Sequence, residues 1–220
     1  ARPTRCRPTR CRHSTVSPPG PVIATVVEGE GEVTALPVLL RRLAYQLGYW
    51  TAHFPKPHRH HRGALVQPGG LERIIEQVAV LTPTAPAILV VFDADDDCPA
   101  ALAPALLARA QATRPDRHIA VVLANREFES WFLAAAPSLA GIRGLAADLK
   151  AHPTPENPRD CKGWLTHQRV DGQRYRPAVD QSALADAIDL AAARQNAPSF
   201  DKFCRDVERL LVAATSNQHN

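Results

Sequence analysis

Short apolar runs rich in β-branched residues recur along the chain. They cover residues 22–27, 87–92 and 118–123. Continuous apolar runs of about six residues are typical of parallel strands that are buried on both faces of a sheet. A further short strand is expected over residues 49–54. The pattern therefore predicts a sheet of short parallel strands.

Stretches with helical spacing of apolar residues separate these runs. The first begins at Val33 and continues with leucines at positions 36, 39, 40, 43 and 47, after which Gly48 favours a stop. Further helices are expected over about 71–81 and 101–112. Strands that alternate with helices of this length form right-handed βαβ units. We therefore expect an α/β fold with a Rossmann-like parallel sheet flanked by helices.

The chain changes character after residue 136. Residues 137–177 contain several prolines and little periodicity, whereas residues 184–194 and 200–212 have helical spacing. Ser199 suits the N-cap of the last helix, because its hydroxyl can accept a hydrogen bond from a free backbone N–H. The expected parts are a disordered basic tail (1–20), an α/β core (21–136), and an irregular segment with a helical C-terminal extension that packs on the core (137–220).

The net charge of +4 does not by itself indicate a polyanionic partner. Arginines at positions 2, 5, 7, 10 and 12 lie in a tandem Arg-Pro-Thr-Arg-Cys repeat, and the rest of the chain is close to neutral. This tail is either without function or a basic arm that touches phosphates.

Cysteine use and hydropathy restrict the class of protein. The five cysteines lack the C-x-x-C spacing of zinc or redox sites. The first twenty residues lack the apolar stretch of a signal peptide, and the sequence contains no run of about twenty apolar residues that could span a bilayer. We expect a soluble, reduced, cytoplasmic protein without a membrane partner.

Two acidic clusters directly follow the first and second long apolar runs. Residues 28–32 read Glu-Gly-Glu-Gly-Glu, and residues 93–97 read Asp-Ala-Asp-Asp-Asp. The carboxyl ends of strands in open α/β sheets are where ligands bind. Carboxylates that are this close repel one another unless a cation lies between them. The pattern therefore predicts a divalent metal, Mg²⁺ or Mn²⁺, held by oxygen ligands, and with it phosphate chemistry.

In the first cluster, Glu28 stands at the mouth of a buried strand, where a charge is costly without a partner. Gly29 and Gly31 allow a tight turn beside it. Glu32 falls four residues after Glu28 and can reach the same site. Alternatively, Glu30 and Glu32 only favour the start of the helix, where negative charge is stabilised.

In the second cluster, Asp93 and Asp95 should point to the same side, because residues two apart in a strand share a face. That places both carboxylates against one metal. Asp96 and Asp97 are equally explained as solvated loop residues or as an N-cap for the next helix.

Two other stretches carry candidate chemistry. Glu127 and Glu129 open a helix just past a strand end, at the expected ligand face, although helix starts favour Glu in general. Trp131, which follows them, is expected in the core rather than as a platform for base stacking. Residues 58–62 read His-Arg-His-His-Arg and form either a solvated loop or a patch that contacts phosphates; the histidines lack the rigid spacing of a zinc site.

At these residues the chain resembles the Toprim superfamily, the α/β metal-binding domain of topoisomerases, primases and overcoming-lysogenisation-defect nucleases. The matching motifs are a strand ending in Val27-Glu28-Gly29 and a later strand ending in Asp93-Ala94-Asp95. More closely, residues 22–211 resemble the Toprim-like bacterial family catalogued as domain of unknown function 4276. The further motifs that carry this resemblance are Glu127-Phe128-Glu129-Ser130-Trp131-Phe132-Leu133, Cys161-Lys162, Tyr175 and Ser199-Phe200-Asp201-Lys202-Phe203.

The resemblance implies roles for particular side chains. Glu28 becomes the candidate general acid/base, and Lys162 becomes a candidate for stabilising charge in the transition state. The metal ligands that it implies are Glu28, Glu32, Asp93, Asp95 and Glu129.

The chain also departs from the better-known Toprim enzymes. It has no tyrosine in a topoisomerase context, no primase zinc module and no ATPase domain. We therefore expect a Mg²⁺-dependent phosphodiesterase, similar to nucleases, that acts on nucleic acid, with a protein such as an ATPase as a candidate partner. Phage defence is the role that its nuclease relatives suggest. The alternative is a non-catalytic module that binds a metal and a phosphate-containing ligand or a partner.

Overall fold

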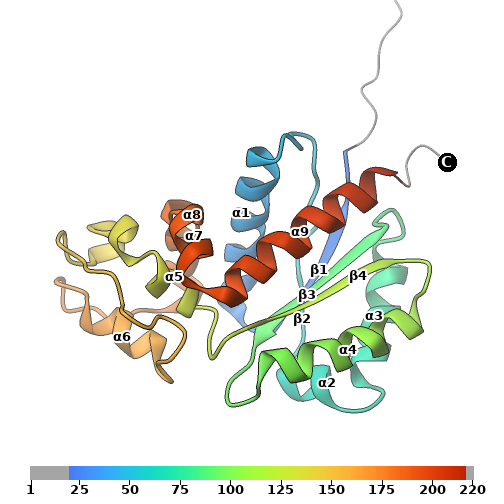
Figure 1. Ribbon diagram of the computed structural model, residues 1–220, viewed down its shortest axis with the longest axis horizontal. Coiled ribbons are helices and arrows are strands. Elements are labelled where there is room, and N and C mark those ends of the chain that lie inside the picture. Colours follow the sequence, from blue (N-terminus) through green and yellow to red (C-terminus); the bar gives the residue numbers. More distant parts are fainter. Residues whose placement is uncertain (1–19, 217–220) are drawn as a thin grey trace, which may run out of the picture.

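A four-stranded parallel sheet forms the centre of the computed structural model, which describes residues 20–216. The strands are β1 (Ile23–Val27), β2 (His58–Arg59), β3 (Ala87–Asp93) and β4 (His118–Ala124), and they lie in the order β2-β1-β3-β4 (Figure 1). β1, β3 and β4 are the apolar runs of the sequence. The fold is therefore α/β with a Rossmann-like parallel sheet, as the alternation of strands and helices predicts.

Helices cover both faces of the sheet and give it three layers (Figure 1). One face carries α2 (Arg62–Val66), α3 (Gly70–Leu81) and α4 (Pro99–Thr113). The other face carries α1 (Glu30–Gln46) and α9 (Pro198–Ser216). Successive strand residues are buried in opposite layers because side chains alternate across a strand. Those on the α1 and α9 side are Ile23, Val27, Leu89, Val91, Ala120 and Val122, and those on the α3 and α4 side are Ala24, Val26, Ile88, Val90, Ile119 and Val121.

The segment between β4 and α9 is made of short helices and turns. After α5 (Ser130–Ala134) come two 3-10 turns, η1 (Ala136–Leu139) and η2 (Ile142–Gly144), and then α6 (Cys161–His167). α7 (Pro177–Ala187) packs along α1, and α8 (Leu190–Asn196) packs against α9. Trp131 in α5 is fully buried and contacts Phe200 and Phe203 of α9, so it belongs to the core, as expected.

The prediction of a strand over residues 49–54 is wrong. In that stretch only His53 pairs, as an isolated bridge with Val22, and β2 forms later, opposite Val26 and Val27. Pro55 and Pro57 lack the backbone N–H that a sheet ladder requires, which delays pairing until His58. The stretch 58–62 is therefore an edge strand followed by the start of α2, rather than a simple loop.

The details of the C-terminal helices also differ from the expectation. The helix expected over 184–194 is two helices, because Asp189 accepts hydrogen bonds from the N–H groups of Ala191 and Ala192 and starts α8. Ser199 is not the N-cap of α9, which already begins at Pro198. Its hydroxyl instead accepts from Trp131 Nε1 at 2.8 Å, so a tertiary contact replaces the local one.

Within residues 20–216, no helix combines the length and the apolar character that crossing a membrane requires. The predicted tail lies almost entirely outside the described residues.

Candidate functional site

The carboxyl ends of β1 and β3 open into a cavity of about 360 Å³. The strands point towards the part of the molecule that contains α5, α6 and α7 (Figure 1). Gly31 lets α7 approach the start of α1, since a Cβ at this position would lie 2.8 Å from the carbonyl oxygen of Pro177. The residues predicted for the site that line this cavity are Glu28, Glu32, Asp93, Glu129 and Lys162.

Lys162, in the first turn of α6, lies among three carboxylates. Its Nζ is 3.1 Å from Glu127 Oε2, 3.2 Å from Glu129 Oε2 and 3.8 Å from Asp93 Oδ2. Burial lowers the pKa of Lys162, but the three negative charges outweigh burial and raise this pKa overall. Lys162 is therefore a permanent cation at the centre of the acidic cluster.

Glu129 is completely buried. Its Oε1 accepts hydrogen bonds from the Tyr175 hydroxyl at 3.1 Å and from Gln181 Nε2 at 3.3 Å, while Lys162 faces Oε2. Burial is the main reason that the pKa of Glu129 is raised. Tyr175 and Gln181 thus hold Oε1 of Glu129, whereas Oε2 forms an ion pair with Lys162 but has no hydrogen-bond donor among the described residues.

Asp93 ends β3, and its side chain is mostly buried. Its Oδ1 accepts a hydrogen bond from the Phe128 N–H at 2.7 Å, and its Oδ2 faces Lys162. The pKa of Asp93 is raised well above its ordinary value, first by burial and then by the charges of Glu32 and Glu129. Asp93 is therefore held in place, but its negative charge is only partly compensated.

Glu32 is turned back onto the start of its own helix. One carboxylate oxygen accepts hydrogen bonds from the N–H groups of Glu28 at 3.1 Å and Gly29 at 2.9 Å. This is the reciprocal half of a capping box, so the helix-start interpretation describes this contact. Burial raises the pKa of Glu32 to about 7.

Glu28 differs from Glu129, whose Oε2 also lacks a hydrogen bond but faces Lys162, because one buried oxygen of Glu28 has neither a hydrogen bond nor an ion pair among the described residues. Oε2 is buried and has no hydrogen-bond partner among the described residues. The pKa of Glu28 is raised by burial first and by the charge of Asp95 second. A buried acceptor without a donor is costly in a native protein. This oxygen is therefore free to bind a cation or to carry a proton.

Asp95 does not join Asp93 in this cavity, contrary to the expectation that the two point to the same side. β3 ends at Asp93, and Asp95 takes a left-handed backbone conformation with φ of 51°. Its carboxylate is more than half exposed and lies 3.2 Å from Arg62 Nε. The alternation of a strand no longer applies after this turn, which is why the sequence argument fails here.

No group of three or more His, Cys, Asp or Glu side chains within residues 20–216 is arranged to hold a metal ion. The contacts show why: Glu32 caps α1, Glu129 is held by Tyr175, Gln181 and the Lys162 ammonium group, and Asp95 faces Arg62. Glu28 and Asp93 remain as candidate metal ligands. Their oxygen chemistry and the orphaned Glu28 Oε2 fit Mg²⁺, which proteins commonly hold through only one or two carboxylates together with substrate phosphates and water.

Tyr175 and Gln181 belong to the site although the sequence assigned no role to them. Both contact Glu129, from 46 and 52 positions further along the chain. Separations of this size leave no local periodicity to detect. The presence of Tyr175 among the motifs of the family resemblance was the one available signal.

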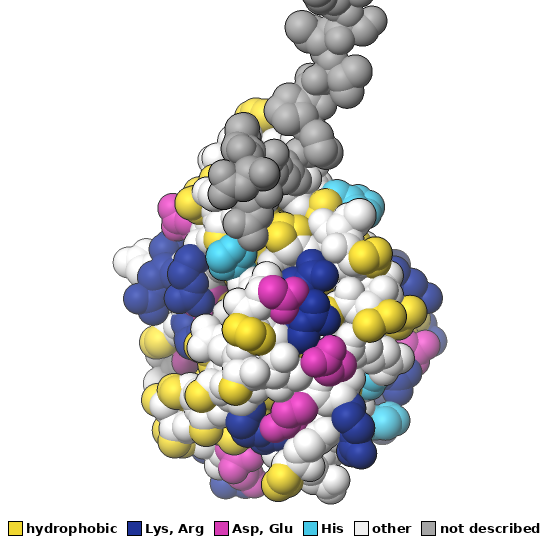
Figure 2. All heavy atoms as spheres, turned by 90° about the vertical axis from the view of Figure 1, so that its right-hand side faces the viewer, with side chains coloured by type: hydrophobic (Ala, Val, Ile, Leu, Met, Phe, Trp, Pro, Cys, Tyr) yellow, Lys and Arg dark blue, Asp and Glu magenta, His cyan; other side chains and the backbone are white. Residues whose placement is uncertain are grey.

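Two of the basic residues near the site are paired with acidic ones, whereas Arg59 donates to the Glu28 carbonyl oxygen. Arg62 contacts Asp95 and Asp97, and Arg126 contacts Asp96. Figure 2 shows the right-hand side of Figure 1, away from the cavity, where basic and acidic side chains are interspersed over the visible surface. Among the residues seen there, no extended patch of one sign stands out.

The fold and the site define an α/β protein with a buried acidic cavity at the carboxyl edge of a parallel sheet. Residues 27–208 match the family described as domain of unknown function (DUF4276), and the chain belongs to this family. No curated protein and no solved structure matches the chain.

Proposed function

We propose that the protein is a Mg²⁺- or Mn²⁺-dependent phosphodiesterase that acts on nucleic acid. The observation that carries the proposal is the buried, donor-free Oε2 of Glu28 in the same cavity as Asp93. Carboxylates that are enclosed without sufficient donors at the carboxyl edge of a parallel sheet are typical of sites built for a cation and its ligand. The resemblance to Toprim proteins suggests nucleic acid as the class of substrate.

Glu28 and Asp93 would hold the metal. When bound, the ion would neutralise charge on a phosphate and make water more acidic. The raised pKa of Glu28 suits a group that takes up a proton from water and returns it to a leaving oxygen. The Phe128 N–H fixes the Asp93 carboxylate, so that its second oxygen faces the cavity.

Lys162 would stabilise negative charge on the phosphate. Its ammonium group is permanently charged and lies at the wall of the cavity, between Asp93 and Glu129. A preorganised cation in an enclosed site stabilises a developing charge more strongly than a cation in water does. Glu129, Tyr175 and Gln181 would act as positioning residues that hold Lys162 in this place.

The proposal is tested by calorimetric titration of Mg²⁺ and Mn²⁺ into the wild type, Asp93→Asn and Glu28→Gln. Asp93→Asn keeps the oxygen that accepts from Phe128 and removes only the charge, so the fold should be retained. The matched control is Asp148→Asn, because Asp148 is exposed and does not line the cavity. The same proteins are incubated with single- and double-stranded DNA and RNA.

We expect metal binding and metal-dependent cleavage by the wild type and the Asp148→Asn control, and loss of both in the two site variants. Full activity of Asp93→Asn would refute the proposal. Metal binding without cleavage of any substrate would favour the non-catalytic module that binds a phosphate-containing ligand.

A further inference from the structure

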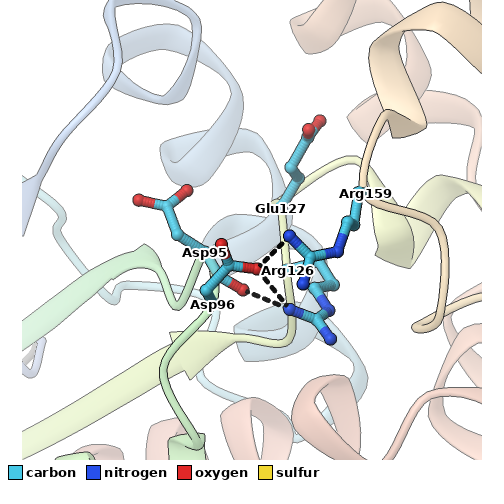
Figure 3. A pocket seen from close by; sticks show the side chains of 5 residues that line it. All are labelled: Asp95, Asp96, Arg126, Glu127 and Arg159. Atoms are coloured by element: carbon cyan, nitrogen blue, oxygen red, sulfur yellow. Dashed lines mark hydrogen bonds and ion pairs between the residues drawn. The ribbon is translucent and has the colours of Figure 1, made fainter.

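A second cavity, of about 330 Å³, adjoins the first and is lined only by charged residues. They are Asp95, Asp96, Arg126, Glu127 and Arg159 (Figure 3). The two cavities share three segments of the chain, which follow β3, follow β4 and surround the start of α6. Asp93 lines the first and Asp95 the second; Lys162 lines the first and Arg159, just ahead of it in the chain, the second. Glu127 lines the second cavity and contacts Lys162 of the first.

Two arginines converge on one oxygen in this cavity. Arg126 Nη1 and Arg159 Nη1 both lie 2.8 Å from Oδ1 of Asp96, and Figure 3 shows both side chains turned towards that carboxylate. Arg126 comes from the end of β4, and Arg159 comes from the irregular segment before α6. The arrangement resembles the way in which guanidinium groups surround a phosphate oxygen.

The three carboxylates that line this cavity have different partners. Asp95 pairs with Arg62, and Glu127 shares Lys162 with Asp93 and Glu129. In Figure 3 the carboxylates of Asp95 and Glu127 point away from Arg126 and Arg159. Asp96 is therefore the lining carboxylate that the two arginines share, and its departure would leave both guanidinium groups facing the cavity.

The backbone beneath the arginines is strained in a way that fixes Arg126. Arg126 and Asp95 both have left-handed conformations, with φ of 64° and 51°, which residues other than glycine adopt rarely. The Asp95 N–H donates to the Arg126 carbonyl oxygen at 3.0 Å, and Arg126 Nη1 donates to the Asp95 carbonyl oxygen at 3.1 Å. Such strain is retained mainly where a side chain must be held for function.

We infer that Arg126 and Arg159 form a second phosphate subsite, which binds the neighbouring backbone phosphate of a nucleic-acid strand, and that Asp96 is an internal substitute for that phosphate. The inference rests on the proposed function, because it assigns the first phosphate to the cavity of Glu28, Asp93 and Lys162. A binding strand displaces the exposed Asp96 carboxylate from the two arginines. The lining consists of charged side chains without an aromatic ring, which suits contacts to the phosphate backbone rather than to the sequence.

The test uses the full chain and measures binding of fluorescein-labelled single-stranded DNA and RNA oligonucleotides by anisotropy, in EDTA and over a range of salt concentrations. EDTA removes divalent metals, so binding is measured independently of any cleavage. The variants are Asp96→Ala and Arg126→Ala/Arg159→Ala. Asp116→Ala is the matched control, because Asp116 is also an exposed acid shared by two arginines, Arg114 and Arg117, and does not line either cavity. Melting temperatures verify that each variant is folded.

Asp96→Ala should bind the oligonucleotides about tenfold more tightly than the wild type, since the arginines lose their competing acceptor. The double arginine variant should bind more weakly, and its slope of log K against log salt should become shallower by about 0.7, the contribution of one phosphate contact in a single strand. Asp116→Ala should match the wild type.

An Asp96→Ala variant that binds no more tightly than Asp116→Ala would overturn the inference, as would an unchanged salt slope in the folded double arginine variant. If no metal supports cleavage but Asp96→Ala tightens binding, the phosphate subsite stands and the proposed hydrolysis fails. If cleavage occurs while none of these variants changes binding, the proposed hydrolysis stands and the subsite fails.

Discussion

Lys162 Nζ lies 3.2 Å from Oε2 of Glu129, a residue that is completely shielded from solvent. Replacing Lys162 with Met would leave the charges of Asp93, Glu127 and Glu129 without their shared cation. We expect the free energy of unfolding to fall by about 2–4 kcal/mol, less than for a fully buried pair because Lys162 is partly exposed. Chemical denaturation in EDTA measures this loss.

Lys150→Met is the control for Lys162→Met, because Lys150 is an exposed lysine in the same irregular segment. It should change the free energy of unfolding by less than about 0.5 kcal/mol. Equal effects of the two substitutions would show that the ion pairs of Lys162 do not stabilise the fold.

Tyr175→Phe removes one hydroxyl that donates to the buried Glu129. Gln181 and Lys162 still face this carboxylate, so we expect a moderate loss of about 1–2 kcal/mol. Thermal or urea unfolding measures this loss, with Tyr45→Phe as the control, since Tyr45 is about half exposed. A Tyr175→Phe variant as stable as the wild type would contradict a stabilising role of the hydrogen bonds around Glu129.

Stability without divalent metal should decrease as the pH rises from about 4.5 to about 7. The pKa of Glu32 is about 7 in the folded protein and near 4.5 in the unfolded chain. Between these values the folded protein holds a proton that the unfolded chain has lost, so the free energy of unfolding falls with rising pH. The raised pKa values of Glu28, Asp93 and Glu129 act in the same direction.

Urea denaturation in EDTA over this pH range measures the effect, which should reach about 2–3 kcal/mol. Glu32→Gln should flatten the dependence, because an amide oxygen can still accept from Glu28 and Gly29 without titrating. The exposed Glu208→Gln should leave it unchanged. A stability that instead rises across this range would contradict the raised carboxylate pKa values.

Gly31→Ala should destabilise the contact between α1 and α7. A Cβ at this position would lie 2.1 Å from Gln181 Oε1 and 2.8 Å from the Pro177 backbone, so α7 would have to move. We expect a loss of about 1–3 kcal/mol, measured by thermal unfolding. Gly63→Ala meets nothing within 4 Å and should be neutral or slightly stabilising, because alanine is the better helix former. A loss of equal size in both variants would contradict the packing argument.

The sequence predicts the parts of the fold that depend on local patterns. β1, β3 and β4 are recognisable because each is a continuous apolar run, and their shared direction brings Glu28 and Asp93 to one edge. β2 is not recognisable, since its two residues, His58 and Arg59, carry no apolar pattern and pair only because β1 lies beside them.

The same distinction holds within the site. Asp93 could be placed because it ends a strand, whereas the position of Asp95 depends on a left-handed turn stabilised by Arg126, 31 residues away. The local sequence suits Ser199 for the N-cap of α9, but its hydroxyl instead accepts a hydrogen bond from Trp131, 68 positions away. Long-range partners decide these cases, and a single sequence does not reveal them.

Helix α9 also occupies hydrogen-bonding groups at the β4 edge of the sheet that could otherwise pair with a strand of another chain. Lys202 Nζ donates to the Val121 carbonyl oxygen, and the Asn125 N–H donates to Ser199 Oγ, so α9 occupies hydrogen-bonding groups of the edge strand β4. During synthesis β4 leaves the ribosome long before residues 198–216. Until they follow, these hydrogen-bonding groups lack their partners from α9, and an open strand edge of this kind can pair with other chains.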